Sequence, residues 1–260
     1  MIRTVRATRY VTPLREGGSL PAIVEADDDG LYVVKFRGAG QGQRALIAEL
    51  IAGEIGRGLG LPVPEIVFVE LDPALGRNEP DPEIKALLDA SAGLNLGLDF
   101  LPGAIAYDPA APPHPDPGLA SAVVWFDAYV TNVDRTPRNT NLLLWHRRLW
   151  LIDHGASLYF HHTWRDHVAA AGAPFRPIKE HVLLPLASVL PEADAELGRR
   201  LTPEALEAVV GLVPEGWLGD VPLFADAAAH RRAYVEYLAR RLEAPRAFTQ
   251  EAVDARAGRV

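Results

Sequence analysis

The sequence predicts an α+β fold with two lobes: a small antiparallel sheet carrying one main helix, and then a mostly helical lobe. Three observations predict this arrangement. Short apolar stretches with strand-like alternation dominate the first part of the chain, a proline-rich stretch follows, and helical spacing of apolar residues dominates the rest. We therefore expect a sheet lobe at residues 1–101, a hinge or linker at 102–117, and a helical lobe at 118–260.

The sheet lobe is expected to begin with three antiparallel strands within residues 3–37, the last of them after an Asp-Asp-Asp-Gly turn. A helix is predicted at 43–59, because apolar residues recur there at helical spacing: Leu46, Ile47, Leu50, Ile51, Ile55 and Leu59. The remaining elements are a strand, a helix and a last strand that leads into the hinge: 65–71, about 83–90, and 94–101.

The second lobe is expected to be helical apart from one pair of strands. The predicted strands are 142–145 and 149–152, and the predicted helices are 119–130, 191–200, 202–213 and about 221–243. Thr202 is expected to cap the third of these helices, because it precedes Pro203 and Glu204. Residues from 245 onward are polar, and we expect them to be frayed.

A short polar loop before the two strands of the second lobe carries Asp134, Asn139 and Asn141, and Asp153 follows the second strand. Phosphoryl transfer needs a carboxylate to orient the attacking hydroxyl, and oxygen ligands to hold Mg²⁺. Asp134 suits the first task and Asp153 the second. Asn139 has the Asp-to-Asn spacing of a kinase catalytic loop, whereas Asn141 directly precedes the strand, so either amide is a candidate metal ligand. A plain polar turn is the competing interpretation.

Lys35 is a second candidate, because only three of the 26 basic residues are lysines. It lies in a β-branched, aromatic strand, where a compact ammonium suits a contact to a phosphate oxygen. The helix that follows carries Glu49, which is a candidate partner for the lysine, and Glu54 is a rival. The alternatives are a lysine that extends to solvent at a sheet edge and glutamates that are simply solvated.

Together these motifs resemble the HipA-like kinases, specifically the compact branch with a single kinase-like domain. The resemblance rests on Val-Val-Lys-Phe around Lys35, the helix with Glu49, the loop NVDRTPRNTN and the segment LIDHG, and it covers roughly residues 10–245. It implies a bilobal fold related to protein kinases and phosphoinositide kinases, with ATP and Mg²⁺ as cofactors. Serine or threonine hydroxyls would then be the acceptors. The chain departs from protein kinases in having Asn132-Val133 before Asp134, where they have His-Arg.

The resemblance also implies roles for individual residues. Lys35 would contact the nucleotide phosphates, with Glu49 steadying it; Asp134 would orient the acceptor; Asn139 or Asn141 would bind metal together with Asp153. The loop that covers the phosphates would contain Gly17, Gly18 and Ser19, with Ser19 as a candidate for self-phosphorylation. Phe100 and Leu101, at the hinge, would contact the nucleotide.

The composition excludes some binding partners and some kinds of chemistry for this chain. The net charge of −8 argues against nonspecific nucleic-acid binding, which needs a basic surface, and the absence of cysteine excludes disulfides. No stretch near the N-terminus has a signal-peptide layout and no apolar run has membrane-spanning length, so we expect a cytoplasmic protein without a membrane partner. The acceptor and the oligomeric state stay open.

Two rival functions remain at this stage. One is a nucleotide-binding regulatory protein, or pseudokinase, that transfers nothing; Asp134 disfavours it, because a pure binder does not need this residue. The other is transfer of a nucleotidyl group, rather than a phosphoryl group, by the same residues.

Overall fold

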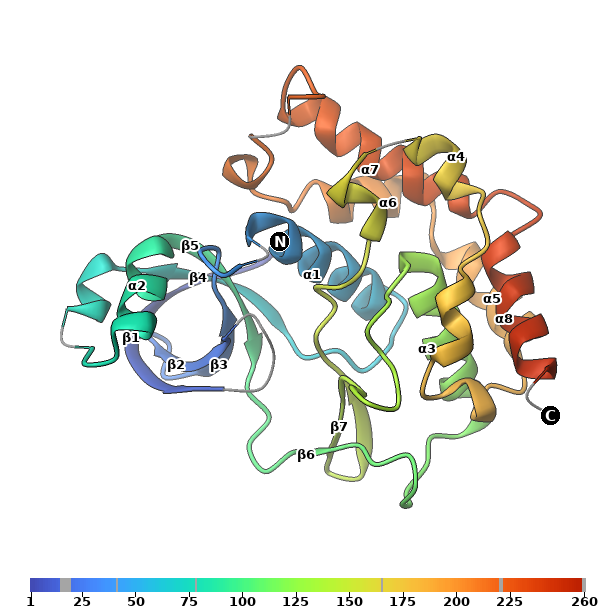
Figure 1. Cartoon of the computed structure of the whole chain (residues 1–260), viewed down its shortest axis with the longest axis horizontal. Coiled ribbons are helices and arrows are strands. Elements are labelled where there is room, and N and C mark those ends of the chain that lie inside the picture. The colour runs from blue at the N-terminus through green and yellow to red at the C-terminus, as the bar shows by residue number, and fades with distance from the viewer. Residues whose placement is uncertain (15–19, 41, 78, 165, 220–221, 259–260) are drawn as a thin grey trace.

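The computed structural model describes residues 1–14, 20–40, 42–77, 79–164, 166–219 and 222–258. It is a mixed α/β structure in which most strands gather at one end of the molecule and most helices at the other (Figure 1). No helix in the described ranges is both long and apolar enough to cross a membrane.

The strand-rich end is a closed barrel with the strand order β1-β2-β3-β5-β4. Its strands are β1 (Thr4–Pro13), β2 (Ala22–Ala26), β3 (Leu31–Lys35), β4 (Ile66–Leu71) and β5 (Gly93–Asp99). Neighbouring strands are antiparallel except β1 and β4, which run parallel and close the barrel. The predicted strands are confirmed, but a purely antiparallel sheet was wrong at this closing pair.

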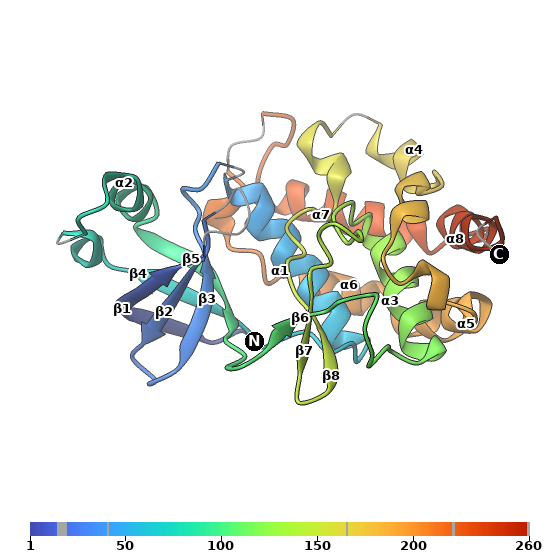
Figure 2. The same ribbon diagram turned by 60° about the horizontal axis from the view of Figure 1, so that its bottom comes forward.

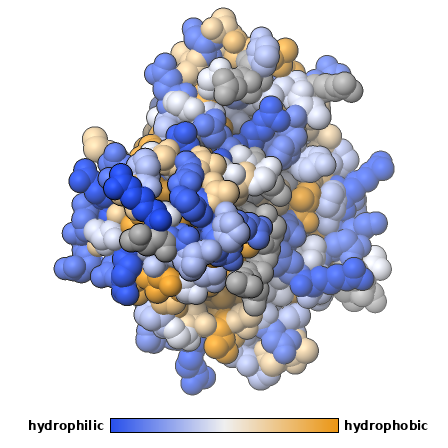
Figure 3. Space-filling view, turned by 60° about the vertical axis from the view of Figure 1, so that its left-hand side comes forward, coloured by the Kyte–Doolittle hydropathy of each residue, from blue (hydrophilic) through white to orange (hydrophobic). Residues whose placement is uncertain are grey.

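Apolar residues from alternate strand positions fill the barrel, because successive side chains of a strand point to opposite faces. Val24, Val34 and Val67 are fully buried there. Gly97 of β5 allows the close packing, since a Cβ at this position would lie 2.7 Å from a methyl of Val69. Hydrophilic residues cover most of the outer face of this end, with only small separate apolar spots (Figure 3).

The long helix α1 (Gly42–Gly58) lies between the barrel and the other helices (Figures 1 and 2). It contacts β4 and β5 on one side and α6 (Pro203–Val210) on the other. Leu50 and Ile51 are therefore fully buried, and so is the charged Glu49. The helix predicted at 43–59 is confirmed, and its position carries a carboxylate into the interior.

Two short helices flank the barrel, and both begin at an aspartate that caps them. They are the 3₁₀ helix η1 (Pro73–Gly76), capped by Asp72, and α2 (Pro82–Ala90), capped by Asp81. An aspartate at this position accepts hydrogen bonds from the first free backbone N–H groups of a helix. The helix expected near 83–90 is thereby confirmed.

The proline-rich stretch after β5 is partly ordered into a second sheet. Its short strand β6 (Ile105–Ala106) pairs with β7 (Leu142–Trp145), and β7 pairs with β8 (Arg148–Leu151), all antiparallel (Figure 2). Tyr107, next to β6, is buried. The proline-rich stretch is therefore paired with the β7–β8 hairpin and is more than a linker between the barrel and the helices.

The helix α3 (Pro117–Val130) is the centre of the helical end. Nearly all its residues from Ala120 onward are buried, and they belong to a core that extends from α1 through the helical end and reaches Leu96 and Leu98 of β5. Asp116 caps the helix and accepts a hydrogen bond from the backbone N–H of Leu119 at 2.9 Å. A single apolar core thus joins the barrel to the helices.

The remaining helices are α4 (His167–Ala171), α5 (Leu190–Arg200), α6, α7 (Ala227–Arg241) and α8 (Ala247–Ala257), with the 3₁₀ turns η2 (Tyr159–His162), η3 (Arg176–Glu180), η4 (Leu184–Leu186) and η5 (Glu215–Trp217). Of these helices, α5, α7 and α8 pack against α3, whereas α4 and α6 pack against α7. Thr202 caps α6 as predicted: its side chain accepts from the N–H of Ala205 at 3.2 Å. The helix predicted at about 221–243 begins later, at Ala227.

The expectation of a frayed end from residue 245 was wrong. Helix α8 contacts α3 and α5, and Phe248 is only 1 % exposed. The hydroxyl of Thr249 donates a hydrogen bond to Asp194 of α5 at 2.7 Å. Polar composition suggested fraying, but a few inward-facing residues suffice to dock a helix whose other face is solvated.

We expect Phe248→Ala to lower the free energy of unfolding by about 3–5 kcal/mol, because it removes a buried aromatic ring and leaves a cavity. Gln250→Ala, an exposed position on the same helix, is the control and should change it by less than about 0.5 kcal/mol. Urea unfolding of both variants measures the difference. Equal, small losses would mean that α8 does not contribute to the core.

Candidate active site

Three segments that are distant in the sequence meet at Lys35, which ends β3. Its ammonium Nζ lies 2.5 Å from Glu49 Oε2 on α1 and 2.5 Å from Asp153 Oδ1, shortly after β8. Lys35 and Glu49 are buried, whereas 44 % of the Asp153 side chain is exposed. The lysine therefore bridges an interior carboxylate and one that faces solvent.

Burial alone would lower the pKa of Lys35, but the carboxylates of Glu49 and Asp153 outweigh it and raise the pKa above its usual value. Burial would likewise raise the pKa of Glu49. The Lys35 ammonium and hydrogen bonds from His154 outweigh that effect and lower the pKa to about 2. Both groups are therefore charged at neutral pH.

Glu49 also holds the segment that carries Asp153. The backbone N–H of His154 donates to Glu49 Oε2 at 2.8 Å, and its ring Nδ1 lies 3.3 Å from Oε1. The His154 ring is buried and packs edge-on against Phe126 of α3, with centroids 5.8 Å apart. Sequence patterns did not indicate this support for Glu49, since a histidine after a strand-end aspartate has no characteristic spacing.

The rival glutamate, Glu54, does not reach the lysine. It pairs instead with Arg57, three residues along α1, at 3.1 Å. The choice between Glu49 and Glu54 depends on which side of α1 faces β3, and helical spacing alone cannot decide this for a helix that is buried on most sides.

The polar loop after α3 gathers around Asp134. Its Oδ2 accepts a hydrogen bond from Asn139 Nδ2 at 2.8 Å and another from Asn141 Nδ2 at 3.3 Å. Burial raises the pKa of Asp134; the amide of Asn141 lowers it, and the nearby charge of Asp153 raises it further. Asp134 and Asp153 are thus near enough for their charges to interact, and the structure brings both candidate amides to the carboxylate of Asp134.

Two of these residues have left-handed backbone conformations. Asn141 has φ of 48° and Asp153 has φ of 54°. Asparagine and aspartate tolerate this region better than other residues with a side chain, yet it still carries a conformational cost. The surrounding contacts therefore have to hold both residues in place.

Next to the loop lies a set of buried polar residues that sequence patterns missed: the ion pair of Asp127 and Arg135, and His181. Arg135 Nε lies 2.6 Å from Asp127 Oδ2, and His181 Nε2 lies 2.9 Å from the same oxygen. All three are at most 3 % exposed. In the sequence Arg135 resembles a solvated loop arginine, and its burial depends on a histidine from a distant segment.

The remaining candidates are the residues of the phosphate-covering loop and of the hinge. Gly17, Gly18 and Ser19 are outside the described residues. Phe100 and Leu101 follow the end of β5, and the residue of β5 that pairs with Lys35 is Leu96. The four residues from Leu96 to Phe100 place this part of the chain roughly 13 Å along the strand from the lysine. Leu101 is buried and Phe100 is partly buried.

The oxygen donors of the site suit a hard divalent cation. Asp134 and Asp153 supply carboxylates, and Asn139 and Asn141 supply amide oxygens; Mg²⁺ binds through one or two carboxylates and completes its shell with water and phosphate oxygens. The described part of the chain holds no cluster of three His, Cys, Asp or Glu side chains able to bind a metal. Two carboxylates and the amide oxygens leave positions for water and phosphate oxygens, so the donor set fits a metal that arrives with a phosphate ligand.

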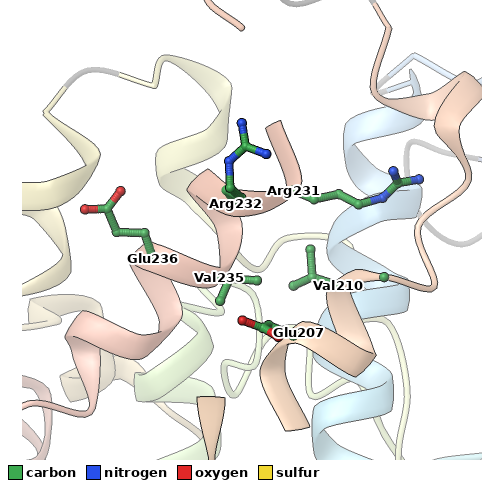
Figure 4. A pocket seen from close by; sticks show the side chains of 7 residues that line it. Glu207, Val210, Arg231, Arg232, Val235 and Glu236 are labelled. Carbon is green, nitrogen blue, oxygen red and sulfur yellow. The ribbon is translucent and has the colours of Figure 1, made fainter. Parts of the chain in front are cut away.

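Two cavities elsewhere lack such converging chemistry. One, of about 370 Å³, lies between α6 and α7 and contains Arg231, Arg232, Glu207 and Glu236 (Figure 4). Its charges are of both signs, and Arg231 already donates to the carbonyl of Val213 at 2.7 Å. The other, of about 570 Å³, lies beside the β7–β8 hairpin and is lined by apolar residues, prolines, exposed arginines, His114 and the helix-capping Asp116. Neither contains a residue from the group around Lys35.

Comparisons with known proteins give a family and a fold. A family model described as HipA-like kinase matches residues 8–248. The structure is similar to the crystal structure of a Helicobacter pylori proinflammatory kinase, CtkA, with a TM-score of 0.59 and 12 % sequence identity over 98 % of this chain and 99 % of that chain. This likeness shows a kinase-like fold.

A Golgi casein kinase, with Mn/ADP bound in its crystal structure, gives a TM-score of 0.49 and 13 % identity over 97 % of this chain and 74 % of that chain. No curated protein matches the sequence.

Proposed function

Because the chain belongs to the HipA-like kinase family, and is thus a phosphotransferase, we propose that it transfers the γ-phosphoryl group of ATP, in the presence of Mg²⁺, to a hydroxyl acceptor. The observation that carries this proposal is the Lys35 ammonium bonded to both Glu49 and Asp153. In a kinase, such a lysine contacts the phosphates, and the aspartate binds the metal. We further propose that the barrel and the helical part act as two lobes with the nucleotide between them.

In this proposal Lys35 binds a phosphate oxygen, and Glu49 keeps its ammonium pointing into the site. Glu49 suits this task because it is fully buried and bonded to His154 as well, so the lysine has a fixed anchor on one side. The bond from Lys35 to Asp153 would be exchanged for phosphate contacts when the nucleotide binds. Lysine acts here as a point charge that tolerates such an exchange.

Asp134 is the residue we assign to the acceptor hydroxyl. Both loop amides bond to its Oδ2, so we assign the hydroxyl contact to Oδ1. The hydroxyl would donate a hydrogen bond to this oxygen and pass its proton there as the new O–P bond forms. The bond between the γ-phosphorus and the oxygen that bridges it to the β-phosphate would break in the same step, and ADP would leave. The raised pKa of Asp134 makes it a better proton acceptor than an ordinary aspartate.

ATP would supply the phosphoryl group, and Mg²⁺ would neutralise the charge that develops on that group during transfer. Asp153 and one of the two loop amides would hold the metal. Each amide uses its nitrogen to donate to Asp134 and therefore keeps its oxygen for a cation. A pure binding protein would not need Asp134 in this place, which favours an enzyme over a regulatory pseudokinase.

The identity of the metal-binding amide gives a prediction. We expect either Asn139→Ala or Asn141→Ala, but not both, to raise the Mg²⁺ concentration for half-maximal activity by about tenfold or more, since one of them loses a direct oxygen ligand. Activity titrated with Mg²⁺ and with Mn²⁺ measures this. Equal, small effects would mean that neither amide binds metal and that the loop is a polar turn.

The function itself is tested with ATP labelled at either the γ or the α phosphate. The probe acceptors are the protein itself and a degenerate peptide mixture containing serine and threonine, and intact-mass and peptide analysis locates the product. Transfer of γ label supports the proposal, whereas transfer of α label means nucleotidyl transfer. Binding of ATP without transfer of either label would favour a regulatory pseudokinase. Peptide analysis also tests Ser19 as a self-phosphorylation site.

A further inference from the structure

Arg135, the residue after Asp134, is buried and links three separate segments. It is only 1 % exposed, and its Nε donates to the carboxylate of Asp127 in α3 at 2.6 Å. Its Nη1 donates to the backbone carbonyl of Asn141 and, at 3.3 Å, to that of Ile152. One guanidinium thus connects α3, the end of the polar loop and the peptide group that leads into Asp153.

Asp127, the aspartate bonded to Arg135, accepts further hydrogen bonds on both of its carboxylate oxygens. Asp127 Oδ1 accepts from Asn132 Nδ2 at 3.0 Å, and Oδ2 also accepts from His181 Nε2 at 2.9 Å. The backbone N–H of Leu183 donates to His181 Nδ1 at 3.0 Å, so the proton of the neutral ring lies on Nε2 and points at Asp127. Burial would raise the pKa of Asp127, but Arg135 and His181 hold it well below its usual range.

The carbonyls that Arg135 binds lie at two candidate metal ligands whose backbone is left-handed, Asn141 and Asp153. Asn141 is itself left-handed, and the carbonyl of Ile152 belongs to the peptide bond of left-handed Asp153. The N–H of Ile152 also donates to the carbonyl of Asn141 at 3.1 Å. A planar guanidinium presents several donors in a fixed fork, whereas an ammonium cannot reach both carbonyls and a carboxylate in one plane. Arg135 therefore adds side-chain hydrogen bonds to the backbone pairing that sets the distance between the end of the loop and Asp153.

We propose that Arg135, held by Asp127 and His181, is a positioning residue that fixes the spacing between the Asp134–Asn141 loop and Asp153 and so sets the affinity of the site for its divalent metal. This inference rests on the proposed function of that site. Residues that orient metal ligands without touching the metal commonly change metal affinity or activity by about 10–100-fold when they are replaced.

A second buried arginine provides a matched control. Arg241 of α7 is 2 % exposed and, like Arg135, donates to backbone carbonyls, among them those of Tyr129 and Ala128 at 2.7 Å each. None of its hydrogen-bond partners in the described structure belongs to the loop or to the segment around Asp153. Replacing it disturbs a buried guanidinium without disturbing the metal ligands.

The experiment compares Arg135→Lys with Arg241→Lys in the full-length protein. Activity is titrated with Mg²⁺ at saturating ATP, well below both melting temperatures, and nucleotide binding is measured with and without Mg²⁺. We expect Arg135→Lys to raise the Mg²⁺ concentration for half-maximal activity by about tenfold and to leave metal-free nucleotide binding within about twofold. Arg241→Lys should lower the melting temperature while its Mg²⁺ requirement stays that of the wild type.

Equal Mg²⁺ requirements in the two variants would overturn the proposal, because Arg135 would then act only on stability. If Arg135→Lys does not fold, the same titration is made with His181→Leu, which removes one donor to Asp127. A Mg²⁺ concentration for half-maximal activity that rises severalfold supports the proposal, and an unchanged one overturns it. A wild-type protein that transfers no phosphoryl group would contradict the proposed function instead. In that case the Mg²⁺ dependence of nucleotide binding in the same variants still tests the positioning role.

Discussion

Asp134→Asn is expected to bind ATP with unchanged affinity and to lose turnover by a factor of about 10²–10⁴, the usual contribution of a positioned general base. The side chain keeps its size and one oxygen, so the loop amides still find a partner. What is lost is the negative charge that orients the acceptor hydroxyl and takes its proton. The loss should therefore fall on kcat and leave nucleotide binding intact.

Turnover at saturating ATP and the Kd of ATP, measured separately, test this expectation. Asp89→Asn is the control: this aspartate lies on α2, is exposed and pairs with Lys85 at 3.1 Å, so its replacement should leave both quantities unchanged. Wild-type turnover in Asp134→Asn would contradict the assignment of Asp134. A loss of ATP affinity equal to the loss of turnover would assign it to binding.

The parts of the site that sequence patterns could indicate are those whose signal is local. Lys35 stood out because lysine is rare in this chain and this one lies in an apolar strand. Asp134 and the two amides lie within a few residues of each other, between an apolar helix and apolar strands. Their roles remain predictions, but the structure brings them and Asp153 to the same region.

The parts that sequence patterns could not indicate depend on contacts between distant segments. The burial of Arg135 requires His181 and Asp127, which lie on different elements, and no spacing rule connects them. The parallel pairing of β1 with β4 joins strands about sixty residues apart, and alternation specifies which face is buried but not which strand is the neighbour. The docking of α8 was missed for the same reason, because Phe248 finds its partners on α3.

The contrast between Glu49 and Asp153, the two carboxylates on Lys35, leads to the second large effect. Glu49 is fully buried, so its replacement by glutamine leaves a buried ammonium with a weaker partner and should cost about 3 kcal/mol of stability. The side chain of Asp153 is 44 % exposed, so solvent screens its half of the ion pair, and its replacement should cost only about 1 kcal/mol of stability. Replacing Glu49 should therefore mainly lower stability, whereas replacing Asp153 should mainly weaken binding of the nucleotide with its metal.

Asp153→Asn is expected to keep the melting temperature near that of the wild type and to weaken binding of ATP in the presence of Mg²⁺ by about tenfold or more, because a neutral amide is a poor substitute for a carboxylate ligand. Binding of ATP without Mg²⁺ should not weaken, since Lys35 keeps its anchor at Glu49 and loses a competing carboxylate. Thermal melting measures the stability, and calorimetric titrations of ATP with and without Mg²⁺ measure its binding. Glu49→Gln is the matched variant in both measurements. If Asp153→Asn retained the full Mg²⁺ dependence of the wild type, Asp153 would be a structural partner of Lys35 and the metal would have to bind elsewhere.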